Sequence, residues 1–247
     1  MIKFFRKIRQ NLLMENKTGK YFKYALGEII LVVIGILIAL QVNNWNEGEK
    51  LRKTQNAYLK QLATDVDSMN FQYKGIVRFN EMNLTIARNA FTALKACEIS
   101  TKQKDDFDQL LLTYNQLGVL FQISDTYDEM LSANLVASIE DKQFKSLIAE
   151  FFAQRDAMEI YINGYKEELN FAYNEIKKHV IFDFDSSNQT TVNYNISEIC
   201  NRSDFTNAFV EVIRNRENLY QMTVILSQKL ELMHNMPKLE SRQNLDE

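Results

Sequence analysis

The sequence predicts an all-α protein with one N-terminal transmembrane helix, followed by an elongated antiparallel helical bundle of coiled-coil-like character. Three observations predict this fold class. The 247 residues include one proline and seven glycines, too few for a fold built on strands and tight turns. A nearly uninterrupted apolar stretch lies near the N-terminus. Three long segments further along the chain repeat apolar residues with heptad spacing.

Residues 1–23 are predicted to form a basic amphipathic segment on the cytoplasmic side of the membrane. They carry seven Lys and Arg and one acid, Glu15, although the whole chain has a net charge of −3. The apolar side chains of the first fourteen residues fall roughly on one helical stripe, which is typical of a helix lying on a membrane surface. A basic head can also bind nucleic acid, but a short segment tethered at a bilayer makes a poor module, so we expect no nucleic-acid partner.

Residues 24–42 are predicted to cross the membrane. Ile29 to Leu40 is entirely apolar, and only Glu28 and Gln41 interrupt the wider stretch. At ~1.5 Å per residue, such a helix matches the roughly 30 Å hydrocarbon core. The excess of positive charge before the span places residues 43–247 outside the cytoplasm. Because no small-residue cleavage site follows, we expect an uncleaved signal anchor rather than a signal peptide.

Three residues of the span are candidates for contact with another membrane helix. Glu28 lies about one turn inside the span, where its carboxylate either reaches the cytoplasmic interface or meets a partner helix. Gly35 and Ala39 form a small-xxx-small pair that lets two helices approach closely. These residues allow a homo-oligomer or a partner membrane protein, while an interfacial carboxylate is the simpler interpretation of Glu28.

Two blocks of the sequence resemble a known family. The block FFRKIRQNLLMENKTGKYFKYALGEIILVVIGILIALQVNNWNE resembles the N-terminal signature of an uncharacterised family of Bacteroidota membrane proteins, a domain of unknown function. The segment DTYDEMLSANLVASIEDKQFKSLIAEFF resembles the second block of that family, although the glycine-containing pair expected near Ser132-Ala133-Asn134 is missing. The resemblance implies a location, the bacterial inner membrane with a periplasmic C-terminal domain. It implies no known activity and carries over no catalytic residues.

Three heptad-spaced segments predict the long helices of the bundle. They run from Leu59 to Leu94, from Phe144 to Ile176 and from Phe205 to Met233. Each presents a narrow apolar stripe along one face, which is the pattern of long helices that pack side by side. The tail from about residue 237 is polar, and we expect it to fray.

Shorter elements connect these segments. We expect a helix from Asp105 to Leu117, and a second one from Thr126 to about Ser138 that begins with a capping box completed by Glu129. Asp141 is expected to cap the second long helix. The loop IFDFDSSNQTTVNYN is expected to be a polar connection with a short extended stretch. It has acidic spacing like a calcium loop but lacks that loop's glycine and closing glutamate.

Asn80 and Asn83 fall on the apolar seam of the first long segment. They predict that the helix kinks or ends near this point, or that they face a polar layer. Alternatively, together with Arg216, they predict a small polar pocket like those of helical ligand-sensing domains.

Cys97 and Cys200, the two cysteines of the chain, allow a disulfide if the domain lies in an oxidising compartment. Sequence does not show whether the two thiols meet. Closing a loop of about 100 residues would stabilise the fold by roughly 4–5 kcal/mol in the chain-entropy treatment.

The search for chemistry predicts no catalytic residue, metal site or cofactor. The two histidines, His179 and His234, lack the neighbours with which helices build zinc or di-iron sites. No phosphate loop or dinucleotide fingerprint occurs. The sequence therefore favours a non-enzymatic, membrane-anchored interaction protein. The alternative is a ligand-sensing helical domain that signals through a partner membrane protein.

Overall fold

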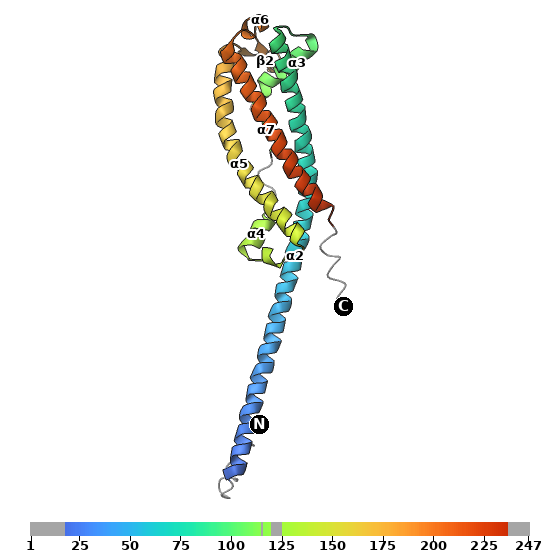
Figure 1. Cartoon of the computed structure of the whole chain (residues 1–247), viewed down its shortest axis with the longest axis vertical. Coiled ribbons are helices and arrows are strands. Elements are labelled where there is room, and N and C mark those ends of the chain that lie inside the picture. The colour runs from blue at the N-terminus through green and yellow to red at the C-terminus, as the bar shows by residue number, and fades with distance from the viewer. Residues whose placement is uncertain (1–17, 115, 120–124, 237–247) are drawn as a thin grey trace. The chain divides into compact units, whose positions relative to one another are not determined.

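The computed structural model describes residues 18–114, 116–119 and 125–236. The predicted amphipathic helix of the first fourteen residues and the polar tail from residue 237 lie outside these ranges. The elements in chain order are α2 (Thr18–Ala96), α3 (Thr101–Thr113), α4 (Thr126–Ser132), the 3₁₀ helix η1 (Val136–Ser138), α5 (Lys142–Ile176), β1 (Ile181–Phe184), β2 (Thr190–Asn193), α6 (Ile196–Ile199) and α7 (Ser203–His234) (Figure 1). The fold is nearly all-α, as the sequence predicts.

The chain divides into two compact units, Met1–Ala57 and Tyr58–Glu247. The first unit contains the N-terminal part of α2. Every side chain from Ile29 to Val42 is exposed, and the most apolar window of this helix has a mean hydropathy of 2.6 with none of it buried. The core helix of a soluble protein would be mostly buried, so this stretch is a helix long and apolar enough to cross a membrane.

The second unit is a bundle whose three long helices are the C-terminal part of α2 together with α5 and α7. Buried side chains fall into two apolar clusters. One joins Leu62–Tyr73 of α2 to the C-terminal half of α7, and the other joins Ile86–Leu94 of α2 to the N-terminal half of α7. The heptad positions identified in the sequence supply most of these side chains. The predicted stripes are therefore the core-facing stripes.

Helix α2 runs without interruption from Thr18 to Ala96, so the candidate span and the first long segment are one helix. Neither proline nor a capping sequence interrupts it, and Gly48 lies within it. Asn80 and Asn83 do not end the helix either. It stops before Cys97, whose φ of 52° is left-handed.

The ends of the shorter helices differ in part from the sequence expectations. Asp141 caps α5 as predicted, its carboxylate accepting hydrogen bonds from the N–H groups of Gln143 and Phe144 at 2.9 and 3.1 Å. The expected start of a helix at Asp105 is wrong. α3 begins at Thr101, because Ser100 and Gln103 form a capping box just upstream.

The capping box predicted at Thr126 is also wrong. Thr126 is buried inside α4, and the N-cap residue is Asp125, which makes no side-chain cap bond. The predicted continuation to Ser138 fails because Asn134 turns left-handed at φ 57°. The N–H of Leu135 then bonds the carbonyl of Met130 at 2.7 Å, which closes a Schellman-type end. Asparagine takes the place where a glycine was expected, since it also tolerates this conformation.

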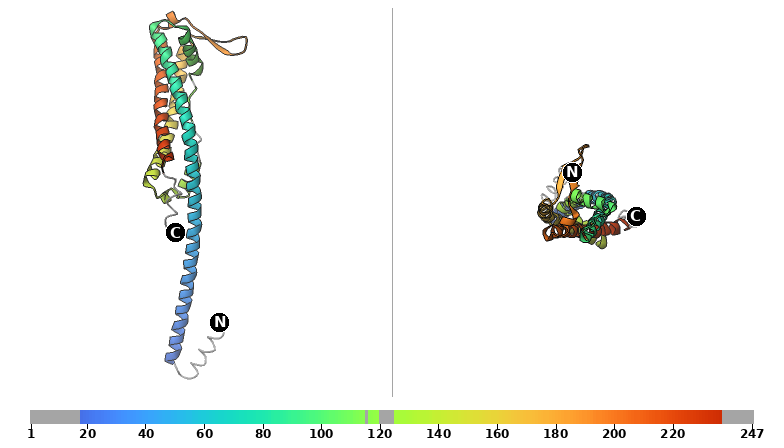
Figure 2. Two further views of the ribbon diagram at one scale, coloured as in Figure 1. Left: turned by 90° about the vertical axis from the view of Figure 1, so that its right-hand side faces the viewer. Right: turned by 90° about the horizontal axis from the view of Figure 1, so that it is seen from above.

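The loop after α5, expected to be a polar connection with a short extended stretch, forms an antiparallel hairpin of two short strands. β1 and β2 pair with Phe182 opposite Val192, and both side chains pack against the second apolar cluster. The turn is closed by Asp185, whose carboxylate accepts from the N–H groups of Ser187 and Gln189. Figure 2 shows the hairpin extending sideways from the helices. Of the two acids with calcium-like spacing, Asp185 therefore serves the turn, while Asp183 lies in β1 and accepts from the N–H of Phe184.

Candidate functional site

A layer of polar side chains separates the two apolar clusters of the bundle. Asn80 and Asn83 come from α2, and Arg216 and Thr223 come from α7. All four are buried, with Arg216 only 3% exposed. Because α7 runs antiparallel to α2, heptad positions of both helices meet at this level. The structure thus brings together the three residues that the sequence singled out as a pocket.

Arg216 is the centre of this polar layer. Its Nη1 donates to the backbone oxygen and to Oδ1 of Asn83, at 3.0 and 3.3 Å. Its Nη2 donates to the backbone oxygen and to Oγ1 of Thr113, at 2.8 and 3.3 Å. One guanidinium therefore joins α2, the end of α3 and α7. All four acceptors are neutral, and within the described residues its Nε has no hydrogen-bond partner.

The surroundings of Arg216 disfavour its charge. Burial lowers the pKa of the guanidinium to about 10. The group remains cationic at neutral pH and is held by dipoles rather than by a carboxylate. A buried cation of this kind costs stability, while its hydrogen bonds fix which helix ends meet.

Asn80 forms the second half of the polar layer. Its Nδ2 donates to the backbone oxygen of Gly118 at 2.9 Å and to Oγ1 of Thr223 at 3.3 Å. A Cβ at Gly118 would lie only 2.5 Å from Oδ1 of Asn80 and from a ring carbon of Phe79. The close approach of the loop to α2 therefore requires glycine at this position.

The polar layer is not the open pocket that the sequence suggested as one alternative. The side chains of Asn80, Asn83 and Arg216 are engaged with other groups of the same chain. Thr113 and Gly118 escaped the sequence reasoning because they contribute mainly backbone carbonyls, which any residue carries. The one local signal is the glycine at position 118, which directly follows the helix expected from Asp105 to Leu117.

A disulfide closes the end of the bundle where α2 finishes. The structure joins Cys97 to Cys200, the C-cap residue of α6, with a Cα–Cα distance of 5.3 Å and a sequence separation of 103. Both cysteines lie in connections, outside the long helices. The bond links the end of α2 to the segment that leads into α7.

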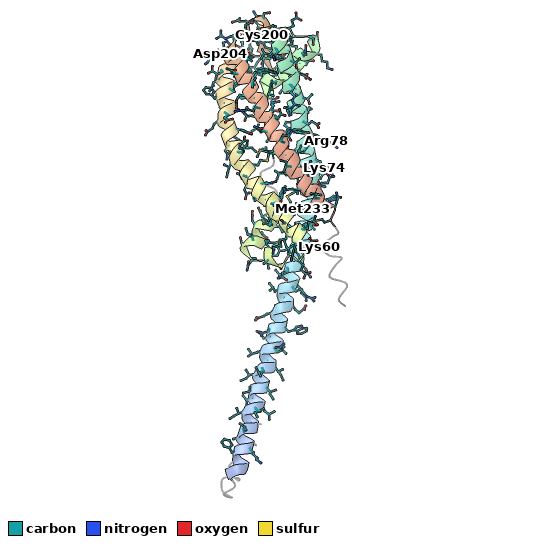
Figure 3. All side chains as sticks on the ribbon, viewed as in Figure 1. Lys60, Lys74, Arg78, Cys200, Asp204 and Met233 are labelled. Carbon is teal, nitrogen blue, oxygen red and sulfur yellow. A yellow bond between two sulfur atoms is a disulfide. The ribbon has the colours of Figure 1, made fainter. Side chains whose placement is uncertain are left out.

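Two side chains contact Asp204, which Figure 3 labels at this end of the bundle. Arg202 donates to both carboxylate oxygens of Asp204, at 3.2 and 3.0 Å, and Nε2 of His179 lies 3.1 Å from Oδ2. The hydrogen bonds from Arg202 and then His179 hold the pKa of Asp204 far below its usual range. His179 thus connects the exit of α5 to the start of α7.

The three candidates in the apolar part of α2 lie on its surface. A Cβ at Gly35 would meet nothing within 4 Å, Ala39 is exposed, and Glu28 is half-buried. The described residues contain no group of three or more His, Cys, Asp or Glu side chains placed to hold a metal ion.

These features define the class of the protein, an α-helical chain with a candidate membrane span and a bundle closed by a disulfide. The chain belongs to a family of unknown function, DUF6090, whose model matches residues 28–217. The matched region includes Glu28, both cysteines and the polar layer as far as Arg216. No curated protein and no solved structure matches the chain.

Proposed function

We propose that this chain is a non-enzymatic, single-pass protein of a bacterial inner membrane that presents its helical bundle to the periplasm for protein interaction. The observation that carries the proposal is helix α2. It holds an apolar, fully exposed stretch from Ile29 to Val42 and continues as a core helix of the bundle. Such a stretch is costly in water and favourable in lipid.

The proposed orientation rests on charge and on redox chemistry. The bases concentrated before the span favour a cytoplasmic N-terminus. The bond between Cys97 and Cys200 fits an exported domain, because disulfides persist in oxidising compartments such as the periplasm. The resemblance of the first block to Bacteroidota membrane proteins supports the bacterial setting.

Interaction is favoured over catalysis by where the polar and apolar groups lie. The buried polar side chains of the bundle mostly bond one another or the backbone. Large apolar side chains lie instead on the surface, including Phe71 at 81%, Ile160 at 76% and Phe171 at 71% exposure. Covering side chains as exposed as these with another protein would be favourable, because it removes apolar surface from water.

Alkaline phosphatase fusions test the anchored, exported arrangement. A fusion after Asn46 should be active and one before Lys20 inactive, because the enzyme requires export to fold. The reverse pattern would contradict the proposal. Affinity capture of the full chain from native membranes then tests the interaction role, and a chain recovered repeatedly without any second polypeptide or second copy would contradict it.

A second candidate function is ligand sensing through a partner membrane protein. It is favoured by Arg216, a buried cation whose acceptors are neutral and whose Nε has no hydrogen-bond partner among the described residues, an arrangement that attracts a small anion. Thermal unfolding of the full chain in detergent with acetate or phosphate tests it. A rise in melting temperature that is absent in an Arg216→Met variant would support sensing, and equal melting with chloride, acetate and phosphate would contradict it.

A further inference from the structure

The outward face of α2 carries an unusual set of side chains for a helix that packs in a core on its other side. Phe71, Gly75, Arg78 and Met82 follow one another with spacings of four, three and four residues, which is heptad spacing. All four are exposed, Phe71 at 81% and Met82 at 50%, and a Cβ at Gly75 would meet nothing within 4 Å. Arg78 lies on the outer edge of α2 (Figure 3).

The outward face of α5 repeats the same spacing with complementary side chains. Ala149, Ala153, Asp156 and Ile160 are all exposed, Ile160 at 76%. The three short residues leave the helix surface open, and Ile160 projects from it. Asp156 is the one charged group of this set. Its Oδ1 accepts both bonds from Arg155, at 2.8 and 2.6 Å.

The two faces lie at the same level of the bundle. Helices α2 and α5 run in the same direction, because α7 runs antiparallel to each. Arg216 and Asn83 join α7 to α2, and Lys229 joins α7 to Glu150 of α5. The rings of Tyr73 and Phe151 also meet, with centroids 5.8 Å apart.

The parallel course of α2 and α5 determines which residues of their outward faces lie at the same height along the bundle. Both helices have the same rise per residue, and Tyr73 of α2 lies beside Phe151 of α5. Counting from this contact, each residue of the outward face of α2 has one residue of the outward face of α5 at the same height. The resulting pairs are Phe71 with Ala149, Gly75 with Ala153, Arg78 with Asp156 and Met82 with Ile160. Phe71 faces the small Ala149, two small residues face each other at Gly75 and Ala153, a base faces an acid at Arg78 and Asp156, and two exposed apolar side chains face each other at Met82 and Ile160.

We propose that the outward face of α2 in one copy of this protein packs against the outward face of α5 in a second copy. The inference rests on the proposed function, because spans inserted in one membrane bring copies of the bundle together. The four pairs meet when α2 of one copy lies parallel to α5 of the second copy, in the register that the two helices have within one bundle. Phe71 then covers the methyl groups of Ala149 and Ala153, and Arg78 reaches Asp156.

The contact is heterologous, because it joins two different faces. Both faces lie on the sides of their helices turned away from the buried residues Tyr73 and Phe151, so one chain cannot close the contact on itself. A heterologous contact forms a ring when the rotation closes and a row when it does not. In either case each copy offers one face and receives the other.

Mixed cysteine crosslinking in membranes tests this contact. Full-length chains carrying Met82→Cys and chains with another tag carrying Ile160→Cys are co-expressed and treated with a short bis-maleimide. Cys97 and Cys200 are bonded and do not react. We expect a crosslinked product carrying both tags from the mixture, and little product from either variant alone. A mixture of Met82→Cys with Ile225→Cys, an exposed position on α7, is the matched control and should give little product.

Charge reversal provides the second measurement. Arg78→Glu should lower the mixed product about fivefold, the effect of replacing an attractive exposed pair by a repulsive one. Adding Asp156→Arg should restore it, whereas Lys102→Glu on α3 should leave the product unchanged. Equal product in the α7 control, or no response to Arg78→Glu, would overturn the contact.

The two proposals fail separately. If the phosphatase fusions keep the expected pattern but the mixed product is missing, the contact between copies is wrong and the membrane-anchored interaction role stands. If the fusions reverse, the anchor that aligns the copies is itself wrong.

Discussion

Replacing Cys97 and Cys200 by serine removes the covalent bond between the end of α2 and the segment before α7. The bond closes a loop of 103 residues, which contains α3, α4, α5 and the hairpin. In the chain-entropy treatment a loop of this length is worth about 4.7 kcal/mol, because the open unfolded chain gains that much freedom. Removing native disulfides costs about 2–5 kcal/mol in small secreted domains, so we expect a loss of about 3–5 kcal/mol.

Thermal unfolding of the full chain in a mild detergent, followed by circular dichroism, measures this loss. For a unit of this size 1 kcal/mol corresponds to about 2–4 °C, so the double serine variant should melt roughly 10–15 °C lower. The wild-type protein treated with reductant is the matched control and should melt within a few degrees of the variant. Equal melting of the variant and the oxidised wild type would refute the reasoning, since the bond would then constrain neither state.

Three further substitutions test the interior of the bundle. Burial raises the pKa of Tyr73 to about 12, so the stability tied to its neutral hydroxyl is complete below about pH 10 and is lost as the pH rises through 12. Tyr73→Phe should therefore reduce the alkaline fall of the free energy of unfolding by about 2 kcal/mol at pH 12, and an unchanged fall in chemical denaturation would contradict this. Gly118→Ala should lower the free energy of unfolding by about 2–3 kcal/mol in chemical denaturation, because the new Cβ displaces the buried amide of Asn80. Gly164→Ala, where a Cβ meets nothing within 4 Å, should be neutral or stabilising. Equal effects of the two substitutions would disprove the close contact. Arg216→Met should lower the free energy of unfolding by less than about 2 kcal/mol, because removing a buried cation offsets the loss of its hydrogen bonds. Arg216→Lys should lower it more, because an ammonium cannot reach both Asn83 and Thr113. A smaller loss for lysine than for methionine in the same denaturation series would contradict this.

The long helices were predictable because their information is local and periodic. A heptad stripe needs only the sequence to be seen, and the cap at Asp141 depends on the two residues that follow it. The end of α4 was harder. It depends on Asn134 taking a left-handed conformation, which asparagine allows but does not enforce.

The hairpin could not be read from the strand pattern alone. β1 and β2 have four residues each, and their pairing depends on the packing of Phe182 and Val192 against the helices. Asp185 has the residue type and spacing of a metal ligand, yet its carboxylate closes the turn. Local sequence does not distinguish these two uses of an aspartate.

The polar layer was predictable in part. Asn80, Asn83 and Arg216 stood out because polar side chains on an apolar seam need partners. The partners themselves come from backbone carbonyls of Thr113 and Gly118, far away in the sequence, and only the folded chain brings them together. The same limit applies to the proposed contact between copies, whose pairs depend on the relative height of α2 and α5.

The most direct test of the central claim is protease treatment of spheroplasts that express the full chain with different epitopes at its two ends. A membrane-anchored protein with an exported bundle predicts that the C-terminal epitope is lost. The N-terminal epitope should remain on a short fragment that stays with the membranes after alkaline washing. A C-terminal epitope that survives until the membrane is permeabilised, or a chain released by the alkaline wash, would contradict the account.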